Sequence, residues 1–147
     1  MTAVPATFDH VTIGVAEVHE ALRFFGVLGF EVVKRVVATG PVMDAYLGLD
    51  GVRADHVTLA IPGAEPYQEV QLLCFDTPRV EVDAGSGFLA RTGLNHFCFR
   101  VDDIAATLQA FVDAGFEARN ELMHFNERDL VFLRGPANVV VELAQWT

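Results

Sequence analysis

One segment of the chain occurs twice, and this repeat limits the possible folds more than any other feature. Residues 8–32 align without gaps with residues 94–118, and seven of the 25 aligned positions are identical. In both copies a Gly-Phe-Glu triplet begins nineteen residues after a histidine, at Gly29 and at Gly115. Self-similarity of this kind indicates a supersecondary unit that is used twice. We therefore predict two copies of one module.

Each copy has the pattern of a strand, a helix and three further strands. The stretch 10–15 alternates apolar with polar or small residues, as a strand does, and an apolar stripe of period 3.6 follows it. Gly29 and Gly115 are placed to end the two helices. The pattern predicts an α+β fold of two βαβββ modules. The further strands are expected at 30–37, 55–61 and 67–75 in the first copy, and at 116–121, 129–134 and 138–145 in the second.

The length of 147 residues suits a single domain made of both modules, over residues 1–147. We place the first module at about 8–75, a linker rich in Gly, Asp, Ser and Thr at 76–93, and the second module at about 94–146. Hydrophobic residues make up 52% of the chain, which is enough to form a core and excludes a disordered chain.

Charge narrows the partners that we expect. Ten Lys and Arg against twenty Asp and Glu give a net charge of −10. Such a surface repels phosphate backbones and anionic lipids, so we expect neither nucleic acid nor membrane as a partner and favour a small molecule. No apolar run is long enough to span a membrane, and no secretory signal is evident. Cys74 and Cys98 lie in apolar runs and are interpreted as reduced core thiols of a cytoplasmic protein.

Strand alternation places four polar side chains at equivalent positions of the two modules. His10 and His96 are expected on the sheet face turned away from the helices, because the apolar residues beside them face the other way. Gln71 and Glu142 each stand between a valine and a leucine in the last strand of their module. If the two sheet faces pack together, these four residues converge.

Two imidazoles, one carboxylate and one amide oxygen suit a divalent metal such as Mn, Fe, Co, Ni or Zn. Gln is neutral, so the ligands contribute one negative charge and the metal keeps a net positive charge. A centre of this kind stabilises an enediolate or another oxyanion formed by proton loss beside a carbonyl.

Several of these residues also allow other interpretations. A histidine on a strand is often a structural hydrogen-bonding residue, and Glu142 could lie on an edge strand facing water. Glu69 shares a face with Gln71 and could be the ligand in its place. Arg100 shares a face with His96, where it could bind a substrate carboxylate or phosphate or form an ion pair. His56 could line a pocket or lie on the plain surface.

The segments FDHVTIGV, GFEV, EVQLL, NHFCFRVDD and LVFLRGPANVVVEL together resemble the vicinal oxygen chelate superfamily. That superfamily includes glyoxalase I, methylmalonyl-CoA epimerase, extradiol dioxygenases and the fosfomycin and bleomycin resistance proteins. The resemblance extends from about Phe8 to Trp146. It implies paired modules that form a cup-shaped, incomplete barrel around a metal, usually in a homodimer.

Carried over position by position, the resemblance puts His10, Gln71, His96 and Glu142 on the superfamily's four metal positions. This ligand set is most similar to that of methylmalonyl-CoA epimerase, and the resemblance implies that Glu142 also acts as a base. The epimerase brings a second acid on the third strand. That strand is ADHVTLAIPG here and contains no Glu, which favours isomerase or lyase chemistry with one base.

We therefore expect a divalent-metal-dependent lyase or isomerase of the glyoxalase or epimerase type that acts on a small molecule. Arg100 and His56 are the candidate substrate-binding residues. One alternative is an Fe(II) extradiol dioxygenase, with His10, His96 and Glu142 as a facial triad. A second alternative is a non-catalytic drug-binding or resistance protein, although such members commonly lose the metal ligands.

Overall fold

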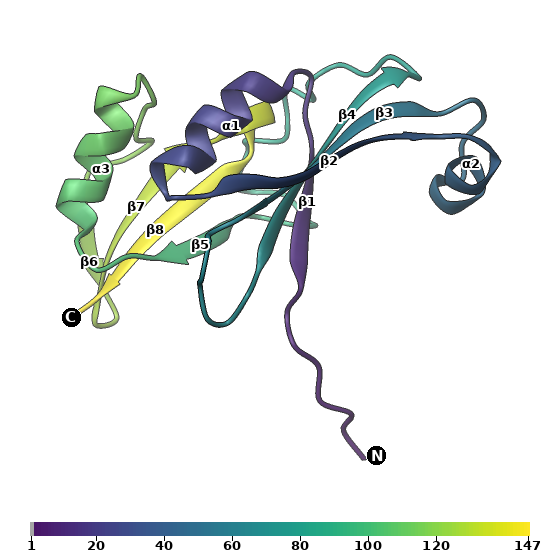
Figure 1. Ribbon diagram of the computed structural model, residues 1–147. Coiled ribbons are helices and arrows are strands. Elements are labelled where there is room, and N and C mark those ends of the chain that lie inside the picture. Colours follow the sequence, from purple (N-terminus) through teal and green to yellow (C-terminus); the bar gives the residue numbers. More distant parts are fainter. Residues whose placement is uncertain (1) are drawn as a thin grey trace. The chain divides into compact units, whose positions relative to one another are not determined.

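The computed structural model describes residues 2–147, which form two four-stranded mixed sheets with helices (Figure 1). The first half of the chain contains β1 (His10–Gly14), α1 (Val18–Val27), β2 (Glu31–Thr39), α2 (Pro41–Leu47), β3 (Arg53–Ala60) and β4 (Glu69–Thr77). The second half contains β5 (Phe97–Arg100), α3 (Ile104–Asp113), β6 (Met123–Phe125), β7 (Arg128–Arg134), the 3-10 turn η1 (Pro136–Asn138) and β8 (Val140–Trp146).

The two sheets share one topology. Their strand orders are β1-β4-β3-β2 and β5-β8-β7-β6, with a parallel pair at the first position and antiparallel pairs elsewhere. Neither sheet closes into a barrel over the described residues. The predicted α+β fold of two similar modules is confirmed. None of the helices within residues 2–147 combines the length and the apolar character that a membrane crossing requires.

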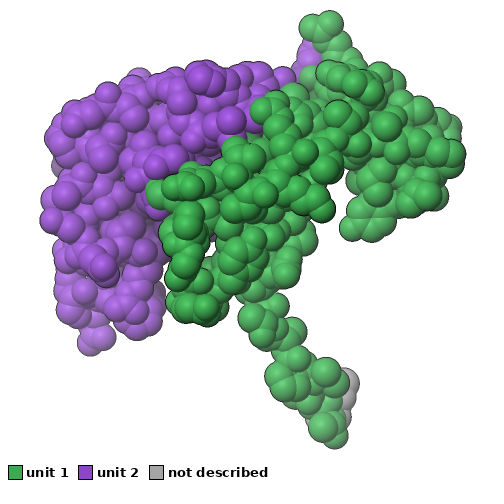
Figure 2. All heavy atoms as spheres, in the orientation of Figure 1, with its two compact units in different colours: residues 1–14, 29–80 green, residues 15–28, 81–147 purple. Residues whose placement is uncertain are grey.

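The chain divides into two compact units, each built on one sheet (Figure 2). The first unit consists of residues 1–14 and 29–80, and the second consists of residues 15–28 and 81–147. Helix α1 therefore belongs to the second unit, although it comes from the first repeat. An apolar stripe shows that a helix face is buried, but not which sheet it is buried against.

The core of the second unit is built on helices α1 and α3. Phe24, Phe25 and Phe111 are fully buried, and the ring centroids of Phe24 and Phe111 lie 4.8 Å apart. Both helices start at an acidic N-cap residue. The Asp103 carboxylate accepts a hydrogen bond from the backbone N–H of Ala106 at 2.9 Å, which satisfies one unpaired donor at the start of α3.

We expect Phe111→Ala to lower the free energy of unfolding by about 3–5 kcal/mol, because it leaves a cavity inside the aromatic cluster. Its neighbour Val112 is 50% exposed on the same helix, so Val112→Ala is the matched control and should change stability by less than about 1 kcal/mol. Chemical denaturation of both variants measures the difference. Equal losses in the two variants would show that the cluster does not carry the stability of this unit.

The predicted glycine ends of the helices are confirmed. Gly29 and Gly115 follow α1 and α3 with φ of +87° and +88°, in the left-handed region that residues with a Cβ rarely adopt. After α3 the backbone N–H of Phe116 donates to the carbonyl of Phe111 at 2.9 Å, which closes the last turn.

Two local predictions differ from the structure. The strand predicted at 116–121 is reduced to a single bridge between Ala118 and Leu133, and β6 forms further along the chain. The reason is that the Asn120 side-chain oxygen accepts the backbone N–H of Phe132 at 2.8 Å, where a strand would supply a carbonyl. The sequence pattern also did not predict helix α2, which lies between β2 and β3.

Candidate functional site

In the second unit a histidine and a glutamate come together at the parallel pair β5–β8. Cys98 lies opposite Glu142 in the register, and His96 immediately precedes β5 on the same side. The Nε2 atom of His96 lies 3.0 Å from Oε2 of Glu142, and the two side chains are 33% and 14% exposed. Two donors that each lie about 2.1 Å from one metal are separated by roughly this distance.

The residue before His96 orients its ring. The Nδ1 atom of His96 lies 2.7 Å from the Asn95 side-chain oxygen, so Nδ1 donates and Nε2 is the nitrogen turned toward Glu142. Phe132 packs edge-to-face against the imidazole, with ring centroids 4.9 Å apart. A hydrogen bond on one ring nitrogen sets the tautomer and leaves the other nitrogen to bind a metal.

The first unit repeats this arrangement at β1 and β4. The Nδ1 atom of His10 is hydrogen-bonded to the carboxylate of Asp9, the residue that precedes it. His10 lies opposite Glu69 in the register, and one donor atom each from Asp9, His10 and Glu69 lie within 4.8 Å of one another. Sequence reasoning did not single out Asp9 and Asn95, although an acid or amide before each histidine is visible in the repeat.

Gln71 lies at the centre of a polar network on the same face of the first sheet. Its side-chain oxygen lies 3.0 Å from Nε2 of His56 and 3.4 Å from the hydroxyl of Thr12, which donates to it. Its amide nitrogen donates to Oε2 of Glu69 at 2.7 Å. The other oxygen of Glu69 accepts the Tyr67 hydroxyl at 2.9 Å, and this bond raises the pKa of Tyr67.

The strand register shows that Gln71 and Glu142 occupy equivalent positions. Gln71 lies opposite Thr12, two residues after His10, and Glu142 lies opposite Cys98, two residues after His96. Glu69 is two residues closer to the start of its strand. In the second module it is therefore Glu142, the counterpart of Gln71, that contacts the histidine.

A cavity of about 560 Å³ opens beside these residues in the first unit. His10, His56 and Gln71 are among its polar lining residues, and helix α2 supplies an apolar wall with Met43 and Leu47. This volume lies in the range of ligand pockets, which are mostly apolar with a few polar groups that orient the ligand. The segment that joins β2 to β3, which includes α2, therefore forms one side of this cavity.

The other predicted substrate residue lies elsewhere. The Arg100 guanidinium stacks over the Trp146 ring at 4.3 Å from its centroid and is not in an ion pair within residues 2–147. Cys98 does not match its predicted place in the core, because strand alternation turns it to the exposed face beside Glu142. Desolvation and the Glu142 charge raise the pKa of the Cys98 thiol to about 12, which argues against a cysteine nucleophile.

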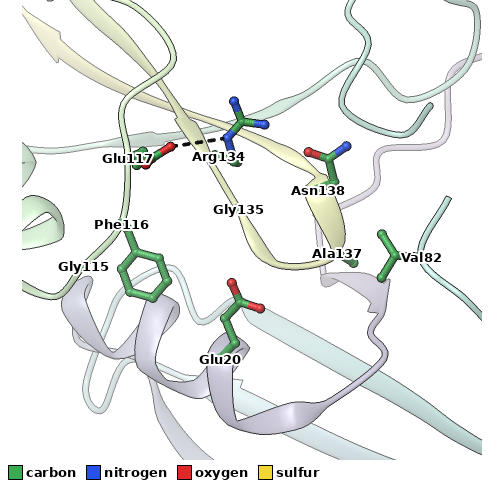
Figure 3. A pocket seen from close by; sticks show the side chains of 9 residues that line it. All are labelled: Glu20, Val82, Gly115, Phe116, Glu117, Arg134, Gly135, Ala137 and Asn138. Carbon is green, nitrogen blue, oxygen red and sulfur yellow. Dashed lines mark ion pairs between the residues drawn. The ribbon is translucent and has the colours of Figure 1, made fainter. Parts of the chain in front are cut away.

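A second cavity, of about 340 Å³, lies in the second unit beside the start of α1 and the turn η1 (Figure 3). The Glu20 carboxylate points into it, and Arg134 is held 3.8 Å from Glu117 by an ion pair. Backbone at Gly135 and Ala137 completes the lining. None of the predicted metal or substrate residues lines this cavity, so the candidate site is the histidine-bearing sheet faces.

The model of the Glyoxalase/Bleomycin resistance protein/Dioxygenase superfamily matches residues 7–143, and the chain belongs to this superfamily. The resemblance inferred from the sequence segments is thereby confirmed at the level of the superfamily. No curated protein matches the sequence significantly.

Solved structures show the same fold. A glyoxalase family protein from Bacillus cereus superposes with a TM-score of 0.86 at 22% identity, over 99% of this chain and 98% of that one. A glyoxalase I variant from Zea mays gives 0.67 at 12% identity, over 93% of this chain and 44% of that one. An antibiotic-binding protein from a Streptomyces species gives 0.62 at 16% identity, over 99% of this chain and 100% of that one.

Proposed function

We propose that the chain is a divalent-metal-dependent enzyme and that His10, Gln71, His96 and Glu142 bind the metal. The observation that carries this proposal is the pair formed by His96 Nε2 and Glu142 Oε2, 3.0 Å apart, with the imidazole oriented from behind by Asn95. The first module repeats the oriented histidine at His10.

The donor set fits a transition metal. Imidazole nitrogen with carboxylate and amide oxygen is a ligand combination suited to Mn, Fe, Co, Ni or Zn. When bound, such an ion supplies positive charge that stabilises an oxyanion formed from a carbonyl or α-hydroxycarbonyl group. The proposed reaction class is therefore a lyase or isomerase reaction that begins with proton loss beside a carbonyl.

Glu142 is the proposed base. Its carboxylate is largely buried and faces the histidine, so it is shielded from competing water while it takes a proton from a substrate carbon and returns it. In the first unit the cavity beside Gln71 would hold the apolar part of the substrate. His56, in contact with Gln71, would orient a polar group of the substrate.

We propose Gln71 rather than Glu69 as the fourth ligand because Gln71 is the register equivalent of Glu142. In this arrangement Glu69 holds the Gln71 amide nitrogen, which turns the amide oxygen away from the carboxylate. Binding of a metal by Gln71 requires its oxygen to exchange the His56 and Thr12 contacts for the ion.

We expect Asn95→Ala to weaken metal binding about 10–100-fold, because the His96 ring loses the acceptor that orients it. Asn95→Asp retains an acceptor and reproduces the pairing of Asp9 with His10, so it should restore most of the affinity. Gln109→Ala, on the surface of α3, is the control. Calorimetric titration with Mn²⁺ or Co²⁺ measures all three variants, and unchanged affinity in Asn95→Ala would contradict the orienting role.

The class of reaction is tested by isotope exchange. A metal-loaded enzyme of the epimerase type should incorporate solvent deuterium at the carbon beside the carbonyl of an acyl thioester, and the chelated protein should not. Oxygen consumption with a catechol, in place of exchange, would instead assign the protein to the extradiol dioxygenases. If neither assay shows metal-dependent activity, both reaction types are excluded.

A non-catalytic binding protein is the second candidate, and the apolar wall of the cavity in the first unit favours it. Such a protein should bind a hydrophobic small molecule equally well before and after metal removal. Metal-dependent turnover would exclude it. A homodimer in the cytoplasm stays part of our proposal, and sedimentation equilibrium of the full chain tests the dimer.

A further inference from the structure

Two arginines stack on one tryptophan on the exposed face of the second sheet. The guanidinium carbon of Arg100 lies 4.3 Å from the ring centroid of Trp146, and that of Arg128 lies 4.9 Å from it. Arg100 belongs to β5 and Arg128 to β7, the strands on either side of β8, which carries Trp146. The tryptophan is therefore approached by a cation from both neighbouring strands.

Neither of these arginines is neutralised by a carboxylate. Within residues 2–147, Arg35, Arg53 and Arg134 each pair with an acidic side chain, whereas Arg100 and Arg128 form no ion pair. What distinguishes Arg100 and Arg128 is that both guanidinium groups stack on the same indole ring. All three side chains of the stack are exposed, so the N–H groups at the guanidinium edges are open to a ligand.

We propose that Arg100, Trp146 and Arg128 form a binding site for an oxyanion, the carboxylate or phosphate group of a small molecule. Stacking on the indole restrains both planar guanidinium groups before the ligand arrives, so less side-chain entropy is lost when it binds. Arginine presents N–H donors in a planar fork that matches carboxylate and phosphate oxygens, and this stack carries two such forks.

The site lies on the same face as the predicted metal ligands of the second unit. Trp146 and Glu142 are four residues apart on β8, so their Cα atoms are separated by about 13 Å along the strand. On this face the Cys98 Sγ atom lies 3.7 Å from Oε1 of Glu142. This step rests on the proposed function. A substrate that reaches both sites would be elongated, with its reactive carbonyl at one end and an anionic group on the order of 10 Å away.

Trp146 is the only tryptophan in the chain, so its fluorescence reports directly on this site. The full chain, passed over a chelating resin to remove metal, is titrated with pyrophosphate and, separately, with succinate. We expect a saturable fluorescence change, with half-saturation raised at least tenfold in Arg100→Gln and in Arg128→Gln. If only pyrophosphate saturates the site, the preferred ligand group is a phosphate. If only succinate does, it is a carboxylate. Arg91→Gln, an exposed arginine of the same unit, is the matched control and should change half-saturation less than twofold.

Sodium chloride at matched ionic strength separates binding from screening. An equal effect of the chloride, or an equal loss in Arg91→Gln, would overturn the proposal. Phosphorus-31 line broadening of pyrophosphate gives a readout that does not depend on tryptophan, and Arg→Lys variants replace any Arg→Gln variant that fails to fold. The titration requires no metal, so its failure is distinguishable from failure of the proposed metal centre.

Discussion

Glu142→Gln should abolish proton exchange with the substrate, lowering the rate by about 10²–10⁴-fold, the usual contribution of a positioned general base. The amide has nearly the same shape and keeps an oxygen that can bind a cation, but it cannot accept a proton. Deuterium uptake from solvent, measured with the metal-saturated variant, reads out the loss. The His96 side chain should keep its place beside residue 142, because Asn95 holds its other nitrogen.

The control for this substitution is Glu121→Gln, which removes an exposed carboxylate of the same unit. It should leave the exchange rate within about twofold of the unsubstituted protein. Metal content must be measured on both variants, because a Glu142→Gln protein that is simply metal-free would report on binding instead of proton transfer. Full exchange activity in metal-loaded Glu142→Gln would rule out Glu142 as the base.

Substitution of Gln71 should weaken metal binding much more than substitution of Glu69. If Gln71 binds the metal, Gln71→Ala should weaken binding by more than the roughly 10–100-fold typical of losing an outer partner. Glu69→Ala removes the acceptor of the Gln71 amide nitrogen and should cost no more than that outer-partner range. Calorimetric titration with the same metal compares the two variants directly.

The opposite order of effects has a definite structural meaning. Glu69 lies opposite His10 and shares a donor cluster with it and Asp9. Full metal affinity in Gln71→Ala, together with loss in Glu69→Ala, would place the ligand two residues earlier on β4. In that case the metal ligands of the two modules would not occupy equivalent positions in the strand register.

The repeat and the strand alternation were sufficient to predict the modules and the faces on which the polar residues lie. Alternation has period two, so a histidine directly before an apolar residue that faces the core must face away from the core side of its sheet. His10 and His96 follow this rule, and Gly29 and Gly115 end the helices as their repeat positions required. These features depend on local pattern alone.

Features that depend on tertiary partners could not be predicted in the same way. Nothing in the stripe of α1 reveals that it groups with the second unit. The stacking of Arg100 on Trp146 joins residues 46 positions apart, and alternation shows only that Arg100 shares a face with His96. The strand predicted at 116–121 does not form in full, because the side-chain oxygen of Asn120 accepts the backbone N–H of Phe132. A backbone carbonyl of the strand would otherwise accept this hydrogen bond.

We propose that this chain binds a divalent metal through histidines from both repeats. The most direct measurement is elemental analysis of the untagged full chain after exposure to Mn, Fe, Co, Ni and Zn and removal of unbound ions. We predict a stoichiometric metal in the unsubstituted protein and its loss in both His10→Ala and His96→Ala, with His19→Ala, an exposed histidine of α1, unaffected. A metal-free protein, or full metal content in either histidine variant, would contradict the proposed metal centre.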